Sequence, residues 1–375
     1  MKKLISVALC VVLCFVFPVS VKANDKPEIS AKAYVLYCVE SGDIILSKNE
    51  NERMKPASTT KLMTVLLTLE QAAKNDSIVT FTDKMQAEGS SMYLSEGDKV
   101  RLSDLAVGMM MASGNDAANA AALTIGGSFE RFAQLMNARA EEIGMSNTHF
   151  VTPSGLDDDN HYSTAHDMAL LMAQGLENRE FASLTSRKSA AVSFISPENK
   201  RITYANHNRL LRLYEGCIGG KTGYTSAAGR CLVSAARRDG LTLICVTLSD
   251  KNDWNDHIAM YDYGFGQYSC YRGAEEELCL DVPCVGGESD SVTAMSEGGN
   301  VIVCDGKNAD KVEKKIYLDS FVYAPVSEGD VIGRIDCVLD GEVLRSIPLT
   351  AVQDVKARKV KKSFIKKIKE FFTYG

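Results

Sequence analysis

Ser58 and Lys61 place a hydroxyl and an amine three residues apart, a spacing that suits a serine nucleophile with a lysine base. The apolar residues that follow recur at helical spacing, at Leu62, Val65, Leu66 and Leu69. This pattern predicts a helix that begins near Pro56, with both side chains on one face of its first turns. Because free N–H groups at a helix start favour developing negative charge, the segment is a candidate for nucleophilic catalysis.

The pair alone has a simpler interpretation, a helix cap beside a surface lysine, and its spacing recurs at Ser363 and Lys366. Two further segments favour the catalytic interpretation over this one. Ser113-Gly114-Asn115 interrupts a helical region, and Lys221-Thr222-Gly223 enters a later strand. Each could be an ordinary turn or strand segment, but the three together, in this order, are the motif set of penicillin-binding proteins and class A β-lactamases.

Hydrophobic periodicity predicts strands on both sides of a mainly helical region, residues 62–185. Within that region Ser103, Ser128 and Thr164 are expected to cap helices. The expected strands are residues 33–39, a return from residue 44, a strand entered by 218–223, and a hairpin of 229–236 with 241–248 turned by Asp239-Gly240. Trp254, Ile258 and Tyr261 predict a helix whose apolar face lies on the sheet.

With these motifs the sequence resembles the low-molecular-mass penicillin-binding proteins, which are serine-type D-alanyl-D-alanine carboxypeptidases, over most of its length. Further runs that carry the resemblance are Ala112 to Ala118, Gly155-Leu156-Asp157, His161 to Thr164, and Lys221-Thr222-Gly223-Tyr224-Thr225. Many members have His where this chain has Ser154, a departure that concerns a loop. The resemblance implies an α+β fold of the β-lactamase and transpeptidase type. In that fold an antiparallel sheet packs against a helical lobe, and a small all-β domain and an amphipathic tail helix follow.

The resemblance, together with the chemistry of the side chains, implies a role for each matched residue. Ser58 would attack the carbonyl between the two terminal D-alanines of a peptidoglycan stem peptide and form an acyl-enzyme, and β-lactams would acylate the same serine. Lys61 would be the base, its pKa lowered by burial and by the nearby Lys221. The remaining implied roles are a proton relay by Ser113, substrate amide binding by Asn115, carboxylate binding by Lys221, Thr222 and Thr225, and an oxyanion hole from the N–H groups of Ser58 and Tyr224 beside Gly223. No metal or cofactor is implied.

Three other functions stay open. A class A-like β-lactamase is disfavoured because no E-x-x-L-N segment supplies a deacylating glutamate, and Gly114 stands where those enzymes usually have Asp. A D,D-endopeptidase that cuts peptide cross-links would carry the same motifs. A non-catalytic peptidoglycan-binding protein is disfavoured by the intact Ser58 and Lys61. Zinc peptidases and α/β-hydrolases are not indicated, since H-E-x-x-H and G-x-S-x-G are missing from the sequence.

The ends of the chain differ in charge from its body. Subtracting +3 for residues 1–23 and +7 for residues 356–375 from the total of −6 leaves −16 on the body, which argues against a nucleic-acid partner. Residues 1–23 are expected to be a signal peptide, with a membrane anchor as the alternative. Residues 353–375 predict a basic amphipathic tail that binds an anionic membrane surface, with a solvated or disordered terminal helix as the alternative.

The expected organisation is therefore a signal peptide, a catalytic domain over residues 24–272, a small β-rich domain over 273–352 and the tail. It predicts an exported protein attached peripherally to the outer face of the cell membrane. Nine cysteines would remain after cleavage, without metal-ligand spacing, and most lie in apolar runs. Buried thiols are therefore favoured over a disulfide framework.

Overall fold

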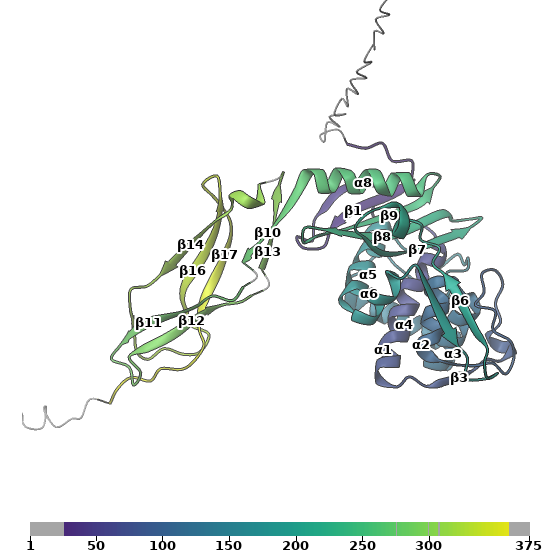
Figure 1. The fold of residues 1–375 in the computed structure, drawn as a ribbon, viewed down its shortest axis with the longest axis horizontal. Helices are drawn as coiled ribbons and strands as arrows, with labels where there is room; N and C mark the ends of the chain where they lie inside the picture. The colour runs from purple at the N-terminus through teal and green to yellow at the C-terminus, as the bar shows by residue number, and fades with distance from the viewer. Residues whose placement is uncertain (1–25, 275, 299, 307, 360–375) are drawn as a thin grey trace, which may run out of the picture.

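A computed structural model of the chain describes residues 26–359 except 275, 299 and 307. The predicted signal peptide, and the tail from residue 360 on, lie outside the described residues. The described chain has two parts, a mixed α/β catalytic domain and an elongated β domain beside it (Figure 1). None of the described helices is both long and apolar enough to cross a membrane.

The catalytic domain is built on a five-stranded antiparallel sheet with the strand order β2-β1-β9-β8-β7. The strands are β1 (Ala33–Cys38), β2 (Ile44–Lys48), β7 (Cys217–Thr225), β8 (Gly229–Arg238) and β9 (Leu241–Asp250). Strand β1 pairs with β9, so strands from both ends of the domain close one sheet, as the sequence predicts. Asp239 and Gly240 turn the hairpin of β8 and β9 with positive φ angles of 47° and 83°.

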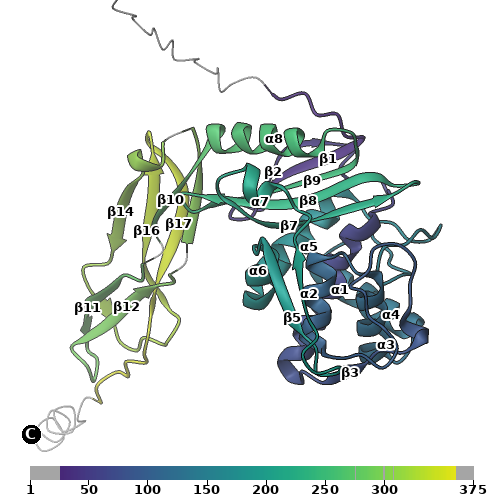
Figure 2. The ribbon, with the colours of Figure 1, turned by 45° about the vertical axis from the view of Figure 1, so that its right-hand side comes forward.

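Alternate residues of each strand enter different cores, which is the two-residue period of a sheet covered on both faces. Val35 packs in the large core of the helical lobe, while its neighbour Leu36 packs against α8 (Asp253–Gln267). Helix α8 is the predicted amphipathic helix, with Met260 and Tyr261 fully buried on the sheet. Figure 2 shows α8 above the sheet and the helical lobe below it.

The helical lobe begins with a 3-10 turn, η1 (Ala57–Thr60), which runs directly into α1 (Lys61–Lys74). The other helices of the lobe are α2 (Leu102–Met111), α3 (Asn115–Gly126), α4 (Phe129–Ile143), α5 (Ala165–Glu177) and α6 (Arg179–Thr185). A short helix, α7 (Leu210–Leu213), precedes β7. Two hairpins that the periodicity did not predict, β3 (Ile78–Thr80) with β4 (Lys99–Arg101) and β5 (Ser189–Ser193) with β6 (Arg201–Ala205), flank the lobe.

Two of the three predicted helix caps are confirmed. Ser128 accepts a hydrogen bond from the N–H of Arg131, and Thr164 accepts one from the N–H of Asp167. The cap at Ser103 is wrong, because α2 already begins at Leu102. Both the N–H and the hydroxyl of Ser103 donate to the carboxylate of Asp76, at 2.8 Å each, so a carboxylate from an earlier segment binds the start of this helix.

The β domain follows α8 through β10 (Tyr268–Ala274), which pairs with β13 (Asn300–Asp305) and runs across the boundary expected at residues 272 and 273. Its main sheet has the order β14-β16-β17-β12-β11-β15. These strands are β11 (Cys279–Val285), β12 (Ser291–Ser296), β14 (Glu313–Leu318), β15 (Val322–Tyr323), β16 (Val331–Leu339) and β17 (Glu342–Ala351). The predicted small all-β domain is therefore present.

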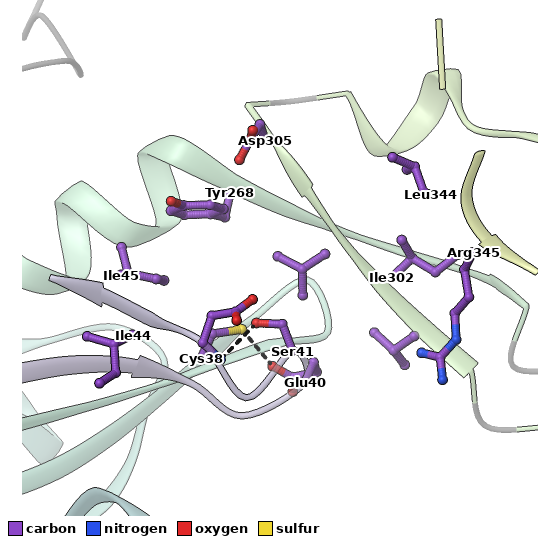
Figure 3. A pocket seen from close by; sticks show the side chains of 13 residues that line it. Cys38, Glu40, Ser41, Ile44, Ile45, Tyr268, Ile302, Asp305, Leu344 and Arg345 are labelled. Carbon is purple, nitrogen blue, oxygen red and sulfur yellow. Dashed lines mark hydrogen bonds between the residues drawn. The ribbon is translucent and has the colours of Figure 1, made fainter. Parts of the chain in front are cut away.

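The two domains face each other across a cavity of about 580 Å³ (Figure 3). The hairpin of β1 and β2 lines one side with Glu40 and Ile44, and Ile302 of β13 and Arg345 of β17 lie opposite. Cys38 also lines this cavity, and it is one of nine cysteines in the described chain, all of them free thiols. The sequence favours buried thiols over a disulfide framework, and six of these nine are buried, whereas Cys217 and Cys270 are partly buried and Cys279 is exposed.

Candidate active site

Lys61 is the first residue of α1, and its amine reaches back to the nucleophile candidate in the preceding 3-10 turn. The Nζ atom lies 2.9 Å from the Oγ of Ser58. It also donates to the Oδ1 of Asn115 and to the main-chain oxygen of Ser154, each at 2.7 Å. Three acceptors from three separate segments therefore fix the amine beside the serine hydroxyl.

Burial favours the neutral form of this amine, which is the form that a base needs. The side chain of Lys61 has no solvent exposure. Loss of hydration and, secondly, the positive charge of Lys221 hold the pKa of Lys61 well below its ordinary value, against a smaller opposing effect of Asp116. The neutral amine can accordingly accept the proton of Ser58.

The carbonyl of Ser154 reaches Lys61 because its loop packs closely on the turn before the nucleophile. Gly155 has a φ of +82°, and a Cβ there would overlap the carbonyl oxygen of Ala57. Only glycine both adopts this positive φ readily and has no Cβ atom to overlap that oxygen. Ser154 meets Lys61 through its main chain, so the departure from the family pattern at this side chain leaves the contact in place.

Ser113 and Lys221 form a second hydroxyl–amine pair opposite the first. The Nζ of Lys221 donates to the Oγ of Ser113 at 3.0 Å and to the carbonyl of Thr222 at 2.7 Å. Lys221 is 2% exposed, and this burial lowers its pKa to about 7. Ser113 itself has a φ of +57°, an uncommon backbone conformation that places it in the break between α2 and α3.

Strand β7 passes directly against the nucleophile. It is the edge strand of the sheet, and a Cβ on its Gly223 would lie 3.0 Å from the N atoms of Ser58 and Thr59. Such contacts are tighter than side chains normally make, so the close approach favours glycine. The arrangement brings the backbone of β7 beside the N–H of Ser58, as an oxyanion hole shared with Tyr224 needs. The oxyanion hole itself stays a prediction.

These groups meet at a cavity of about 540 Å³ between the sheet edge and the helical lobe. Five sequence-predicted residues line it, namely Ser58, Ser113, Thr222, Gly223 and Tyr224. Lys61, Asn115 and Lys221 are buried and hydrogen-bond to one another or to Ser58 and Ser113. The structure therefore brings eight of the nine predicted site residues into one connected group.

Thr225 is placed differently from the others. Its hydroxyl donates to the carboxylate of Asp157 at 2.9 Å and accepts from the N–H of Ala228 at 3.0 Å. Both polar atoms of the Asn115 side chain also have hydrogen-bond partners. Its Oδ1 accepts from Lys61, and its Nδ2 donates to the carbonyl of Glu88 at 2.5 Å. In this structure Asn115 thus orients the base.

Sequence reasoning missed five residues of the cavity wall, which are Ser90, His207, Arg230, Asp253 and Trp254. Ser90 lies in a loop that Asp116 holds, since this carboxylate accepts from the N–H groups of Met92 and Leu94 at 2.8 and 3.1 Å. The sequence does contain a clue to this loop, because Asp116 directly follows the motif Ser113-Gly114-Asn115. His207, Arg230 and Asp253 have no comparable local pattern.

Comparisons with known proteins agree with this geometry. Residues 20–252 match the peptidase S11 family, D-alanyl-D-alanine carboxypeptidase, and residues 274–357 match the C-terminal domain of penicillin-binding protein 5. The chain is similar to D-alanyl-D-alanine carboxypeptidase DacF of Bacillus subtilis, with 31% identity over 95% of each chain. It is 32% identical to DacC of Escherichia coli, over 88% of this chain and 86% of that one. The crystal structure of penicillin-binding protein 5 from Haemophilus influenzae has a TM-score of 0.72 at 31% identity, covering 88% of this chain and 99% of that chain.

The close approach of β7 predicts the effect of Gly223→Ala. The added methyl group pushes the strand away from the N–H of Ser58, so acylation of Ser58 by a penicillin should slow by roughly 10²-fold, as when one oxyanion donor is lost. Intact-protein mass against time gives the rate, and a melting curve checks that the variant is folded. A folded variant that acylates at the wild-type rate would contradict this account of Gly223.

The buried amine of Lys221 predicts how stability depends on pH. Its pKa is about 7 in the folded protein against an ordinary value of 10.5, so between these values the unfolded chain binds more protons. The free energy of unfolding should therefore rise with pH through this window and lose that contribution as pH falls towards 7. Urea unfolding at several pH values should show a smaller rise in Lys221→Met, with Lys84→Met, an exposed lysine, as the control. An identical pH dependence in Lys221→Met and wild type would refute the shift.

Proposed function

Because the chain belongs to the D-alanyl-D-alanine carboxypeptidases of the penicillin-binding protein family, serine-type peptidases that act on peptidoglycan, we propose that Ser58 is its nucleophile and carries the acyl-enzyme. The observation that carries this proposal is the 2.9 Å contact between the Oγ of Ser58 and the buried amine of Lys61. The same serine would react with β-lactams, which place a strained amide where the peptide bond of the substrate lies.

Acylation would begin when the neutral amine of Lys61 takes the proton of Ser58. The freed oxygen attacks the carbonyl between the terminal D-alanines, and the N–H groups of Ser58 and Tyr224 stabilise the negative charge that forms on the carbonyl oxygen. When the C–N bond breaks, the leaving amine needs a proton. Ser113 supplies it, because its hydroxyl lies in the cavity wall and can be reprotonated from the Nζ of Lys221 at 3.0 Å.

Lys61 would next release the proton that it took from Ser58 to the water of the cavity, and Lys221 would take one up in place of the proton it gave to Ser113. Water would then hydrolyse the ester, with the neutral Lys61 again as the base, and the proton taken from that water would return to the oxygen of Ser58 as the ester bond breaks. The product is the stem peptide shortened by one D-alanine. The edge position of β7 supports binding of an extended stem peptide, since an edge strand offers unpaired N–H and C=O groups to a new partner. Asn115 is assigned to positioning Lys61, and its predicted contact with the substrate amide would require its present hydrogen bonds to change.

Attachment to a membrane surface is proposed from the end of the chain. The described chain leaves the β domain at the end farthest from the catalytic domain (Figures 1 and 2). There Val355 pairs with Val326, and the N–H of Arg358 donates to the carbonyl of Gly286. Tyr323 is exposed on the strand that pairs with Val285 at this same end, where an aromatic ring could enter a lipid interface. With the basic tail and an exported chain, the β domain would hold the active site away from the membrane.

The nucleophile assignment predicts that wild type, but not Ser58→Ala, gains the mass of a penicillin. The adduct should be long-lived, because no loop glutamate is available to speed deacylation. Ser363→Ala is the matched control, since Ser363 heads the other Ser-x-x-Lys spacing and should leave the adduct unchanged. Retained release of D-alanine by folded Ser58→Ala would refute the assignment, and an adduct that clears within seconds would favour a β-lactamase.

The membrane proposal predicts that the protein lacking residues 1–23 co-sediments with vesicles containing phosphatidylglycerol. Deleting residues 356–375 removes a net charge of +7, so the bound fraction should fall to the level seen with uncharged vesicles. Raising the salt concentration should weaken binding of the longer protein. An equal bound fraction with and without the tail would count against the proposal.

A further inference from the structure

A carboxypeptidase must recognise the free carboxylate at the end of its substrate, and the structure leaves the expected cation, Lys221, poorly placed for this. Its amine is buried behind Ser113 and the carbonyl of Thr222, and it is 2% exposed. Among the described residues that line the active-site cavity, Arg230 is the one lysine or arginine. Arg230 is therefore the candidate for the group that binds the carboxylate.

Arg230 lies on β8 directly beside the third motif. It pairs with Tyr224 of β7, so its side chain leaves the sheet on the same face as those of Tyr224 and Thr222. All three line the cavity that contains the Oγ of Ser58. The arginine side chain is 46% exposed, so its guanidinium group remains accessible from that cavity.

The guanidinium group is held on one side only. Its Nη2 donates to both oxygens of Asp253, at 2.7 and 2.8 Å, and its Nε donates to Oδ2 at 3.1 Å. Asp253 is itself 3% exposed, in the first turn of α8. No hydrogen bond joins Nη1 to another described residue, so this part of the planar fork is free to bind a second carboxylate.

The ring of Trp254 also lies beside the guanidinium group. The guanidinium carbon of Arg230 lies 5.9 Å from the centre of the Trp254 ring, and that of Arg209 lies at the same distance. Trp254 lines the cavity, whereas Arg209 does not. A fixed guanidinium loses less freedom on binding than a mobile lysine would, which suits recognition of a planar carboxylate.

We propose that Arg230, held by Asp253 and Trp254, binds the α-carboxylate of the terminal D-alanine. This inference rests on the proposed function, with Ser58 as the nucleophile. It assigns to Arg230 the role that the resemblance implied for Lys221, and it leaves Thr222 as a hydroxyl partner beside it. Such a site would favour chain ends over cross-links, because an internal peptide bond presents no carboxylate there.

The test compares two peptide substrates that differ in one group, a diacetyl-Lys-D-Ala-D-Ala with a free carboxylate and its C-terminal amide. Removing Arg230 alone would leave Asp253 buried without its partner, so the main variant is Arg230→Gln with Asp253→Asn, which removes both charges together. Its kcat/KM for the carboxylate peptide should fall about 10- to 100-fold, the value of a charged hydrogen bond, while that for the amide stays unchanged. The preference for the carboxylate should then largely disappear.

Two single variants complete the design. Arg230→Lys should keep part of the preference, and Arg209→Ala, which removes the other guanidinium beside Trp254, should keep all of it. A double variant that retains the wild-type preference, or loses both substrates equally, would overturn the role of Arg230. Ser58 acylation by a penicillin is followed in parallel. If wild type shows neither acylation nor turnover, the proposed function fails together with this inference, whereas normal acylation with an unchanged preference rejects Arg230 alone.

Discussion

The chemistry proposed for this protein depends on removing one amine from water. In solution the ammonium group of a lysine is strongly hydrated and remains protonated at neutral pH. Lys61 is enclosed instead, and its three acceptors are two neutral oxygens from Asn115 and Ser154 and the hydroxyl of Ser58. None of these carries the full negative charge that would stabilise the protonated form. The surrounding fold therefore disfavours the protonated form and places the amine beside the serine hydroxyl.

Segments far apart in the sequence build this enclosure. The start of α1 carries Ser58 and Lys61, the break before α3 carries Ser113 and Asn115, and β7 closes the remaining side. Strand β7 is held in this place by its pairing with β8, and its close approach is eased because Gly223 has no side chain. Sheet and helical lobe are each insufficient alone, so the site exists only in the assembled domain.

The sequence predicted local relations well and distant ones poorly. The spacing of Ser58 and Lys61 determines their contact through helix geometry, and Asp239-Gly240 determines its turn through the φ angles that glycine and aspartate tolerate. The cap at Ser103 failed because the carboxylate that binds this helix start comes from Asp76, a residue in another segment. The contact of Lys61 with a main-chain carbonyl could not be predicted either, since every residue has such a group. Arg230 and Asp253 are likewise joined only by the packing of α8 against β8.

The free thiols have a consequence for how the molecule is made. Every cysteine in the described chain is unpaired, and burial raises the pKa of several, to about 11 for Cys217 and about 12 for Cys231 and Cys270. Because a thiolate is the reactive form, these side chains take part slowly in thiol exchange. The polypeptide can thus reach its native state without an oxidase or an isomerase, in a reducing cytoplasm or in air. Folding of the described part of the chain then requires no disulfide to form.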